Sequence, residues 1–318
     1  MDHPENDAQY AGLAVNKGIE QPPIVNPYLK KMRTAKRRSF TASEYVEGIV
    51  KGDTSILSQA VTLVESNLYE HQTLAQEVIE KCLPHACDSV RVGITGVPGA
   101  GKSTSIDTFG LHVLKRGGKL AVLAIDPSSE RSKGSILGDK TRMEALSREK
   151  NAFIRPSPSA GSLGGVARKT RETIVLCEAA GFDTVFVETV GVGQSETAVH
   201  SMVDFFLLIQ LAGTGDELQG IKRGIMEMAD GIIINKADGD NIEKANLAAA
   251  QFRNALHLFP PSESGWFPKV LTYSGYYNLG IKEIWDMIGE YMEFTKKNGY
   301  FDYKRNEQAK YWMYESIN

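Results

Sequence analysis

The chain has 318 residues and a formal net charge of −3; 42% of its residues are hydrophobic and 24% are charged. These values are typical of a globular protein that can bury its own core, and they give no reason to expect nucleic acid or an anionic membrane as a ligand. Three cysteines are too few for a disulfide framework and favour a reducing compartment.

The first 40 residues are polar, with three prolines and a basic run over residues 30–38. We interpret residues 1–40 as a tail or extended arm, because a run of like charges usually marks a solvated segment. The acidic beginning matches neither a signal peptide nor a typical transit sequence. No apolar stretch approaches the roughly 20 residues of a membrane-spanning helix. We therefore expect a cytoplasmic protein.

Residues 41–90 have a helical pattern. Thr41 and Glu44 have the spacing of a capping box at a helix start. Apolar residues then recur at helical spacing, and a second helical stretch covers residues 68–83. We predict an N-terminal helical extension that precedes the first strand.

Residues 91–297 alternate between helical segments and short apolar runs that are mostly β-branched or aromatic. The predicted strands are 91–95, 119–125, 184–188, 205–210, 231–235 and 270–273. Strands of this kind are buried on both faces, so the pattern predicts an α/β domain with a mostly parallel sheet between helices. A helix over 281–294 closes the domain. Residues 298–318 form an aromatic stretch outside this alternation.

A phosphate-binding loop follows the first predicted strand. The motif G-x-x-x-x-G-K-[ST] is matched by Gly96, Val97, Pro98, Gly99, Ala100, Gly101, Lys102 and Ser103, with Thr104 next. The glycines allow backbone N–H groups to approach an anion at a helix N-terminus. We expect Lys102 to neutralise the β- and γ-phosphates and Ser103 to place its hydroxyl on Mg²⁺.

A second motif predicts which base is bound. Asn235, Lys236 and Asp238 form N-K-x-D at the end of a predicted strand. The Asp238 carboxylate can accept hydrogen bonds from two donors of guanine, which adenine does not offer there. Asn235 can bridge to the phosphate loop, and the stem of Lys236 can lie on the base. We expect the segment containing Ser274, Gly275 and Tyr276 to close over the base, although an ordinary turn explains it almost equally well.

Carboxylates at strand ends beside the loop are candidate magnesium ligands. Asp126 and Glu188 each end a predicted strand, and Asp139 lies in the loop after Asp126. The alternative for Asp126 is a helix cap. Gly191 would let a backbone N–H meet the γ-phosphate, an interaction that hydrolysis of GTP would remove. Lys222 or Arg223 could supply a catalytic cation.

Five motifs together resemble the MeaB/ArgK-type GTPases, which are chaperones of methylmalonyl-CoA mutase and related cobalamin-dependent acyl-CoA mutases. The motifs are GVPGAGKST (96–104), AIDPSS (124–129), GSILGDKTRM (134–143), VETVGVGQSE (187–196) and GDELQGIK (215–222). The likeness covers residues from about 40 to 295. It implies the SIMIBI-class P-loop GTPase fold, with an N-terminal helical extension and a C-terminal helical dimerisation arm at residues 298–318. Exposed aromatic helices also tend to mark interfaces.

The resemblance implies roles for individual residues. Asp126 and Asp139 would take switch and magnesium roles, and Glu188 the switch role after its strand. Residues 213–222 would contact the mutase, with Lys222 turning toward the nucleotide in that complex. The implied function is GTP-gated delivery of adenosylcobalamin to the mutase and its protection, with the cobalamin held only by the partner. We expect slow turnover without a partner, on the order of 10⁻³ to 10⁻² s⁻¹.

Two other functions stay open at this point. A nickel-enzyme maturation GTPase would need a metal site, for which Cys82, His85 and Cys87 are the candidates. A small-molecule kinase would need an acceptor site, and the sequence shows none. The sequence also leaves open which mutase is the partner, whether cofactor is loaded or removed, and whether Glu188, Asp126 or Gln194 orients the attacking water.

Overall fold

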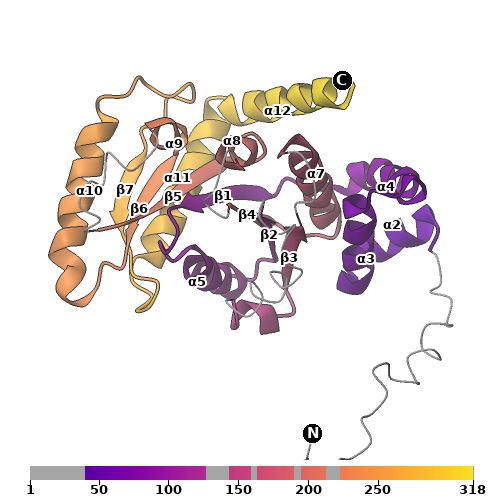
Figure 1. Cartoon of the computed structure of the whole chain (residues 1–318), viewed down its shortest axis with the longest axis horizontal. Coiled ribbons are helices and arrows are strands. Elements are labelled where there is room, and N and C mark those ends of the chain that lie inside the picture. The colour runs from indigo at the N-terminus through magenta and orange to yellow at the C-terminus, as the bar shows by residue number, and fades with distance from the viewer. Residues whose placement is uncertain (1–39, 127–142, 159–162, 190–194, 213–222, 318) are drawn as a thin grey trace, which may run out of the picture. The chain divides into compact units, whose positions relative to one another are not determined.

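The computed structural model describes residues 40–126, 143–158, 163–189, 195–212 and 223–317. Residues 41–318 belong to one compact unit. Its centre is a seven-stranded sheet in which every paired strand is parallel, in the order β3-β2-β4-β1-β5-β6-β7. The strands are β1 (Val90–Gly96), β2 (Leu120–Asp126), β3 (Ala152–Pro158), β4 (Thr184–Thr189), β5 (Phe205–Leu211), β6 (Gly231–Asn235) and β7 (Lys269–Thr272). The predicted parallel α/β fold is confirmed (Figure 1).

One strand was absent from the prediction. β3 contains Arg155 and two prolines, so it lacks the continuous apolar run of the other strands. It lies at the edge of the sheet and pairs only with β2 among the described strands. Proline is tolerated at such an edge because one side of the strand has no ladder partner to lose. Arg155 forms an ion pair with Glu65, which joins this edge to the helical extension.

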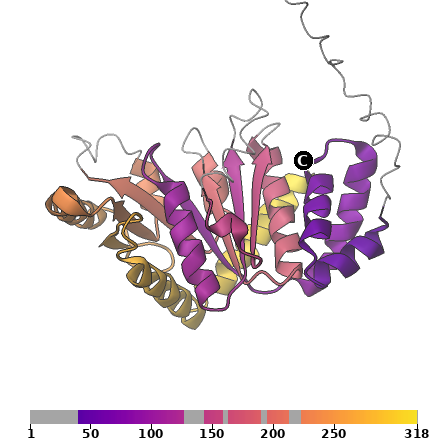
Figure 2. The same ribbon diagram turned by 90° about the horizontal axis from the view of Figure 1, so that it is seen from below.

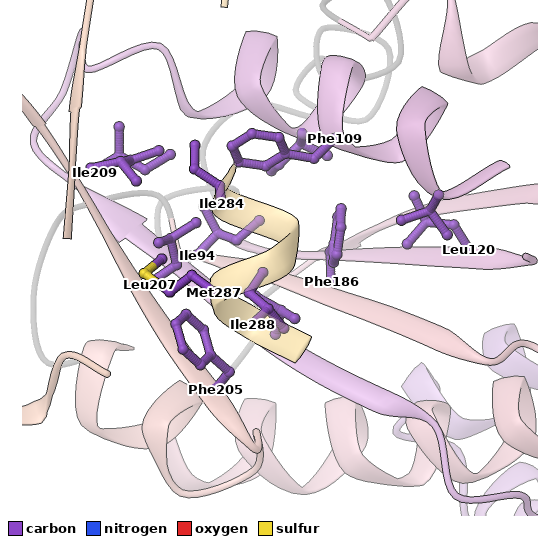
Figure 3. Close-up of a cluster of buried hydrophobic side chains, with 14 of the residues drawn as sticks. Ile94, Phe109, Leu120, Phe186, Phe205, Leu207, Ile209, Ile284, Met287 and Ile288 are labelled. Carbon is purple, nitrogen blue, oxygen red and sulfur yellow. The ribbon is translucent and has the colours of Figure 1, made fainter. Parts of the chain in front are cut away.

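Helices cover both faces of the sheet. α5 (Lys102–Lys115) and α11 (Ile281–Lys297) pack on one face, and α7 (Leu163–Ala179), α8 (Ser195–His200), α9 (Arg223–Met228) and α10 (Ile242–Leu256) on the other. Figure 2 shows α5 in front of the sheet and the C-terminal helix behind it. Figure 3 shows how Phe109 of α5 and Ile284 of α11 meet the side chains of β1, β4 and β5.

In the part of the chain that the structure describes, three helices precede the sheet. They are α2 (Ala42–Val50), α3 (Thr54–Glu65) and α4 (Tyr69–Cys82), followed by a single 3₁₀ turn, η3 (Leu83–His85). The predicted capping box is present: the Thr41 hydroxyl accepts from the Glu44 N–H, and the Glu44 carboxylate accepts from the Thr41 N–H. These helices pack on one another and on α7. No helix in the described ranges has the length and hydropathy required to span a membrane.

The C-terminal helix α12 (Tyr300–Ile317) crosses the edge of the sheet at which β1 and β5 begin. The Arg305 guanidinium donates to both carboxylate oxygens of Asp204, at 2.6 and 2.8 Å, and to the carbonyl of Ser89 at 2.8 Å. Further along, Gln308 donates to the carbonyl of Val203. The guanidinium of Arg171 in α7 lies over the Trp312 ring. The helix is therefore fastened to its own chain along several turns.

Candidate functional site

Among the described residues, three loops meet at the carboxyl edge of the sheet. The phosphate loop joins β1 to α5, the N-K-x-D loop joins β6 to α10, and a short turn follows β7. β1 lies in the centre of the sheet between β4 and β5, so the phosphate loop sits beside the ends of both. This edge of a parallel α/β sheet is where ligands bind in such folds.

Glycines in the phosphate loop are required by close approach and by backbone angle. A Cβ at Gly96 would lie 2.3 Å from the carbonyl oxygen of Ile209 in β5. Gly101 has a φ of +87°, and a Cβ there would lie 2.5 Å from the side-chain nitrogen of Asn235. Both positions therefore exclude other residues. α5 begins directly after the loop, at Lys102, so the first amides of this 14-residue helix face the loop.

Lys102 lies against the inside of this loop. Its ammonium donates to the carbonyl of Gly96 at 2.8 Å and to that of Val97 at 3.3 Å. Burial lowers the pKa of Lys102, and the carboxylates of Glu188 and Glu196 oppose that effect. A partly desolvated ammonium of this kind interacts strongly with an added anion, because little water competes for it.

Glu188 and Ser103 come together beside the loop. The Ser103 hydroxyl donates to the Glu188 carboxylate at 3.4 Å, across 85 residues of sequence. Next to them, the buried hydroxyls of Thr189 and Thr95 form a 2.8 Å hydrogen bond that ties the end of β4 to β1. A hydroxyl and a carboxylate are hard oxygen donors, so this pair fits Mg²⁺. The backbone of Asp126 ends β2, which pairs with β4.

Asn235 connects all three loops. Its side-chain amide donates to the carbonyl of Ala100 at 2.7 Å, and its side-chain oxygen accepts from the N–H groups of Lys236 at 2.7 Å and Gly275 at 3.3 Å. Asn235 is only 4% exposed. The predicted bridge from the N-K-x-D motif to the phosphate loop is thus present in the structure.

Asp238 and Ser274 form the base-side part of the site. The Ser274 hydroxyl donates to the Asp238 carboxylate and accepts from the N–H of Tyr277. Tyr276 is 82% exposed and contacts the ring of Tyr277 edge to face. The structure therefore brings Ser274 and Gly275 to the motif and places the Tyr276 side chain in solvent.

Some of the expected residues fall outside the part of the chain that the structure describes. Asp139, Gly191, Gln194 and Lys222 are outside the described residues, and Arg223 begins α9. The sequence pattern predicts no role for Glu196, although this residue is buried and its charge acts on Lys102. Glu196 stands two residues after the expected 191–194 loop, and this closeness is the signal that could have indicated its place at the site.

The candidate nickel ligands do not converge. Cys82 is fully buried at the end of α4, and burial raises the pKa of its thiol to about 11. The Cys87 thiol donates to the carbonyl of Phe182, and His85 is exposed on the 3₁₀ turn. Among the residues that the structure describes, no three His, Cys, Asp or Glu side chains are grouped to hold a metal ion.

Comparison with known proteins assigns the family. The family model described as "Methylmalonyl Co-A mutase-associated GTPase MeaB" matches residues 57–318. This chain belongs to the MeaB family. A relative called "Putative GTPase" from Caulobacter vibrioides is 53% identical over 269 residues, which cover 85% of this chain and 82% of the relative. Its description and that of the family agree with the GTPase character predicted from N-K-x-D.

Two further relatives extend the MeaB likeness. The mouse protein "Methylmalonic aciduria type A homolog, mitochondrial" is 48% identical over 292 residues, covering 89% of this chain and 70% of the mouse protein. A crystal structure titled "LAO/AO transport system kinase" has a TM-score of 0.76 and 40% identity, covering 88% of this chain and 84% of that one. The family resemblance inferred from the five sequence motifs is confirmed.

Proposed function

We propose that this chain binds GTP with Mg²⁺ at the carboxyl edge of the sheet and hydrolyses it to GDP and phosphate. We further propose that this cycle gates adenosylcobalamin delivery to an acyl-CoA mutase of the methylmalonyl-CoA type, and protects or reactivates that enzyme. The observation that carries the nucleotide part is the Asn235 side chain, which joins the N-K-x-D loop to the phosphate loop. The family description and the name of the mouse relative support the mutase part.

The base-side geometry supports the proposed selection of guanine. With the Ser274 hydroxyl on one oxygen of Asp238, the carboxylate keeps further lone pairs for the two donors on the guanine edge. Adenine would leave that acceptor unpaired, which costs affinity because a partly buried charge loses its hydrogen bonds. We assign Asn235, Lys236, Asp238, Ser274 and Gly275 to guanine binding.

Phosphate binding uses the other end of the site. Residues 96–104 cradle the phosphates with backbone N–H groups, and Lys102 exchanges its bonds to loop carbonyls for bonds to phosphate oxygens. Mg²⁺, when bound, neutralises phosphate charge. Ser103, Asp126, Asp139 and Glu188 are the residues we propose to hold it, directly or through water.

The regions around the GTPase domain have proposed roles as well. We treat residues 41–90 as the helical extension, 91–297 as the GTPase domain and 298–318 as a homodimer arm. In support of the arm, α12 exposes large side chains on one stretch: Tyr303 (55%), Tyr311 (51%), Met313 (53%) and Tyr314 (63%). Residues 213–222 would contact the mutase, with Lys222 completing the site there. We place the protein in the cytoplasm.

Calorimetry and a turnover assay test this function. With magnesium present, GTP should bind at least tenfold more tightly than ATP, and Asp238→Asn should shift the preference toward xanthine nucleotides. Turnover should be slow for the chain alone and faster with its mutase, and should yield GDP and free phosphate. Equal affinity for ATP and GTP would refute the nucleotide assignment. A rate unchanged by every adenosylcobalamin-dependent mutase tested would refute the mutase assignment.

A further inference from the structure

The loop that follows β6 holds a lysine in a conformation that lysine rarely adopts. Lys236 has a φ of +60°, in the left-handed region. A side chain with a Cβ is strained there, and such a residue persists only where its surroundings fix it. Lys236 is also the residue whose stem is expected to lie along the bound base, so its backbone angle decides where that stem points.

Asn241 supplies the restraint. Its side-chain amide donates to the carbonyl oxygen of Lys236 at 2.7 Å, and its backbone N–H donates to the carbonyl oxygen of Asp238 at 3.0 Å. One residue thus holds both ends of the Lys236–Asp238 segment from the far side of a tight turn. The turn includes a second left-handed residue, Gly239, with a φ of +50°.

The bond from the Asn241 side chain to Lys236 is informative because Asn241 stands directly before α10. Asn241 also ends a 3₁₀ turn, η5 (Gly239–Asn241), and its backbone is helical, with φ −95° and ψ −4°. A capping asparagine is usually extended and accepts a hydrogen bond from an N–H of the first helical turn. Within the described residues its side chain makes no such capping bond. The amide is turned back to the Lys236 carbonyl instead, and α10 begins without a side-chain cap.

We infer that Asn241 is a positioning residue for guanine binding: it holds Lys236 in the left-handed conformation that lays the lysine stem along the base. This inference rests on the proposed guanine site. Asn241 contacts the loop backbone and no reacting atom, so its loss should weaken nucleotide binding through Lys236 while leaving the phosphate loop unchanged. The bond is solvent-exposed, so the effect should be about fivefold, the size of one neutral hydrogen bond.

Two substitutions separate positioning from general stability. Asn241→Asp cannot donate to the Lys236 carbonyl, but a carboxylate at the N-terminus of α10 interacts favourably with the helix dipole. We expect it to raise the dissociation constant for GDP about fivefold while the melting temperature stays equal or rises. Asn241→Ala should raise the dissociation constant similarly. Tripolyphosphate, which has no base, should bind all three proteins equally; weaker binding of tripolyphosphate to Asn241→Asp would mean simple charge repulsion and would overturn the inference.

A double-mutant cycle with Lys236→Gly tests the mechanism itself. Glycine adopts a left-handed φ without strain, and it also lacks the stem, so the Asn241 bond has nothing left to position. Asn241→Ala should then change the GDP dissociation constant less than twofold in the Lys236→Gly background. A full fivefold effect in that background would overturn the inference. If the wild-type chain bound GDP no better than ADP, the proposed function would fail instead.

Discussion

The side-chain amide of Asn235 lies 2.7 Å from the carbonyl oxygen of Ala100, although the two residues are 135 positions apart in the sequence. This bond makes the guanine-recognition loop and the phosphate loop parts of one structure. A displacement of either loop is therefore transmitted to the other through a single buried side chain.

Removing this bridge should weaken both the fold and nucleotide binding. Asn235→Ala leaves the Ala100 carbonyl and the N–H groups of Lys236 and Gly275 without their partner. We expect a decrease of about 1–3 kcal/mol in the free energy of unfolding and a drop of at least about tenfold in GDP affinity. Thermal unfolding and calorimetry measure these quantities. Asn254→Ala, at an exposed position of α10, is the matched control and should change neither.

The glycines of the phosphate loop should differ in their tolerance of alanine. Gly99 and Gly101 both have left-handed backbone angles, with φ of +80° and +87°. No described atom lies within 4 Å of a Cβ at Gly99, whereas a Cβ at Gly101 meets the Asn235 side chain at 2.5 Å. Gly99→Ala therefore adds backbone strain of about 1 kcal/mol, and Gly101→Ala adds a clash that breaks the bridge. GDP affinity should fall much further for Gly101→Ala; the reverse order would contradict the observed loop geometry.

Acid should destabilise the protein through His200. Burial, with a smaller effect of Lys304, lowers the pKa of His200 from 6.5 to about 4. The unfolded chain takes up this proton first as the pH falls, so the free energy of unfolding decreases between pH 6.5 and 4, by up to about 3 kcal/mol. Below pH 4 both states are protonated and this contribution is constant. His200→Gln should flatten the profile between these values when unfolding is measured with denaturant.

A second histidine provides the control for this pH dependence. His257 is exposed at the end of α10 and stacks on Phe267. His257→Gln should keep the slope of the wild-type chain between pH 6.5 and 4. If His200→Gln kept the same slope, a group other than His200 would be responsible for the pH dependence.

The anchor of the C-terminal helix should contribute strongly to stability. Arg305 and Asp204 form a largely buried pair, with side-chain exposures of 17% and 2%. Arg305→Met keeps the apolar stem but removes both guanidinium donors to Asp204. The Asp204 carboxylate then retains the hydrogen bond from the backbone N–H of Arg91, at 2.9 Å. We expect unfolding to become easier by about 2–4 kcal/mol and proteolysis within α12 to become faster. Lys310→Met removes an exposed pair with Glu307 and should leave unfolding unchanged.

Much of the fold was predictable because the buried strands are continuous apolar runs. β5 and β6 were located within a residue of their ends, since two-sided burial leaves a strong signal in the sequence. β3 gave no such signal, because an edge strand can contain Pro156, Pro158 and the ion-paired Arg155. Periodicity identifies strands and helices but does not say which of them become neighbours.

The candidate site divides in the same way. The motifs around Lys102 and Asp238 were recognisable because fixed spacing reflects local backbone geometry. The contact between Glu188 and Ser103 joins residues 85 positions apart and depends on the order of the strands. No motif or periodicity marks Arg305 in the sequence, and its burial against Asp204 follows only from where α12 crosses the sheet.

The fastening of α12 limits how a partner could use it. A helix held by Arg305 and Gln308 at the sheet and by Trp312 at α7 cannot swing freely without breaking buried contacts. Its outward side, including Tyr303 and Met313, therefore keeps a fixed orientation relative to the strands. Arg305 binds the carbonyl just before β1, and the phosphate loop begins where β1 ends. A subunit docked on this helix would therefore be separated from the bound nucleotide by the length of β1, which has seven residues.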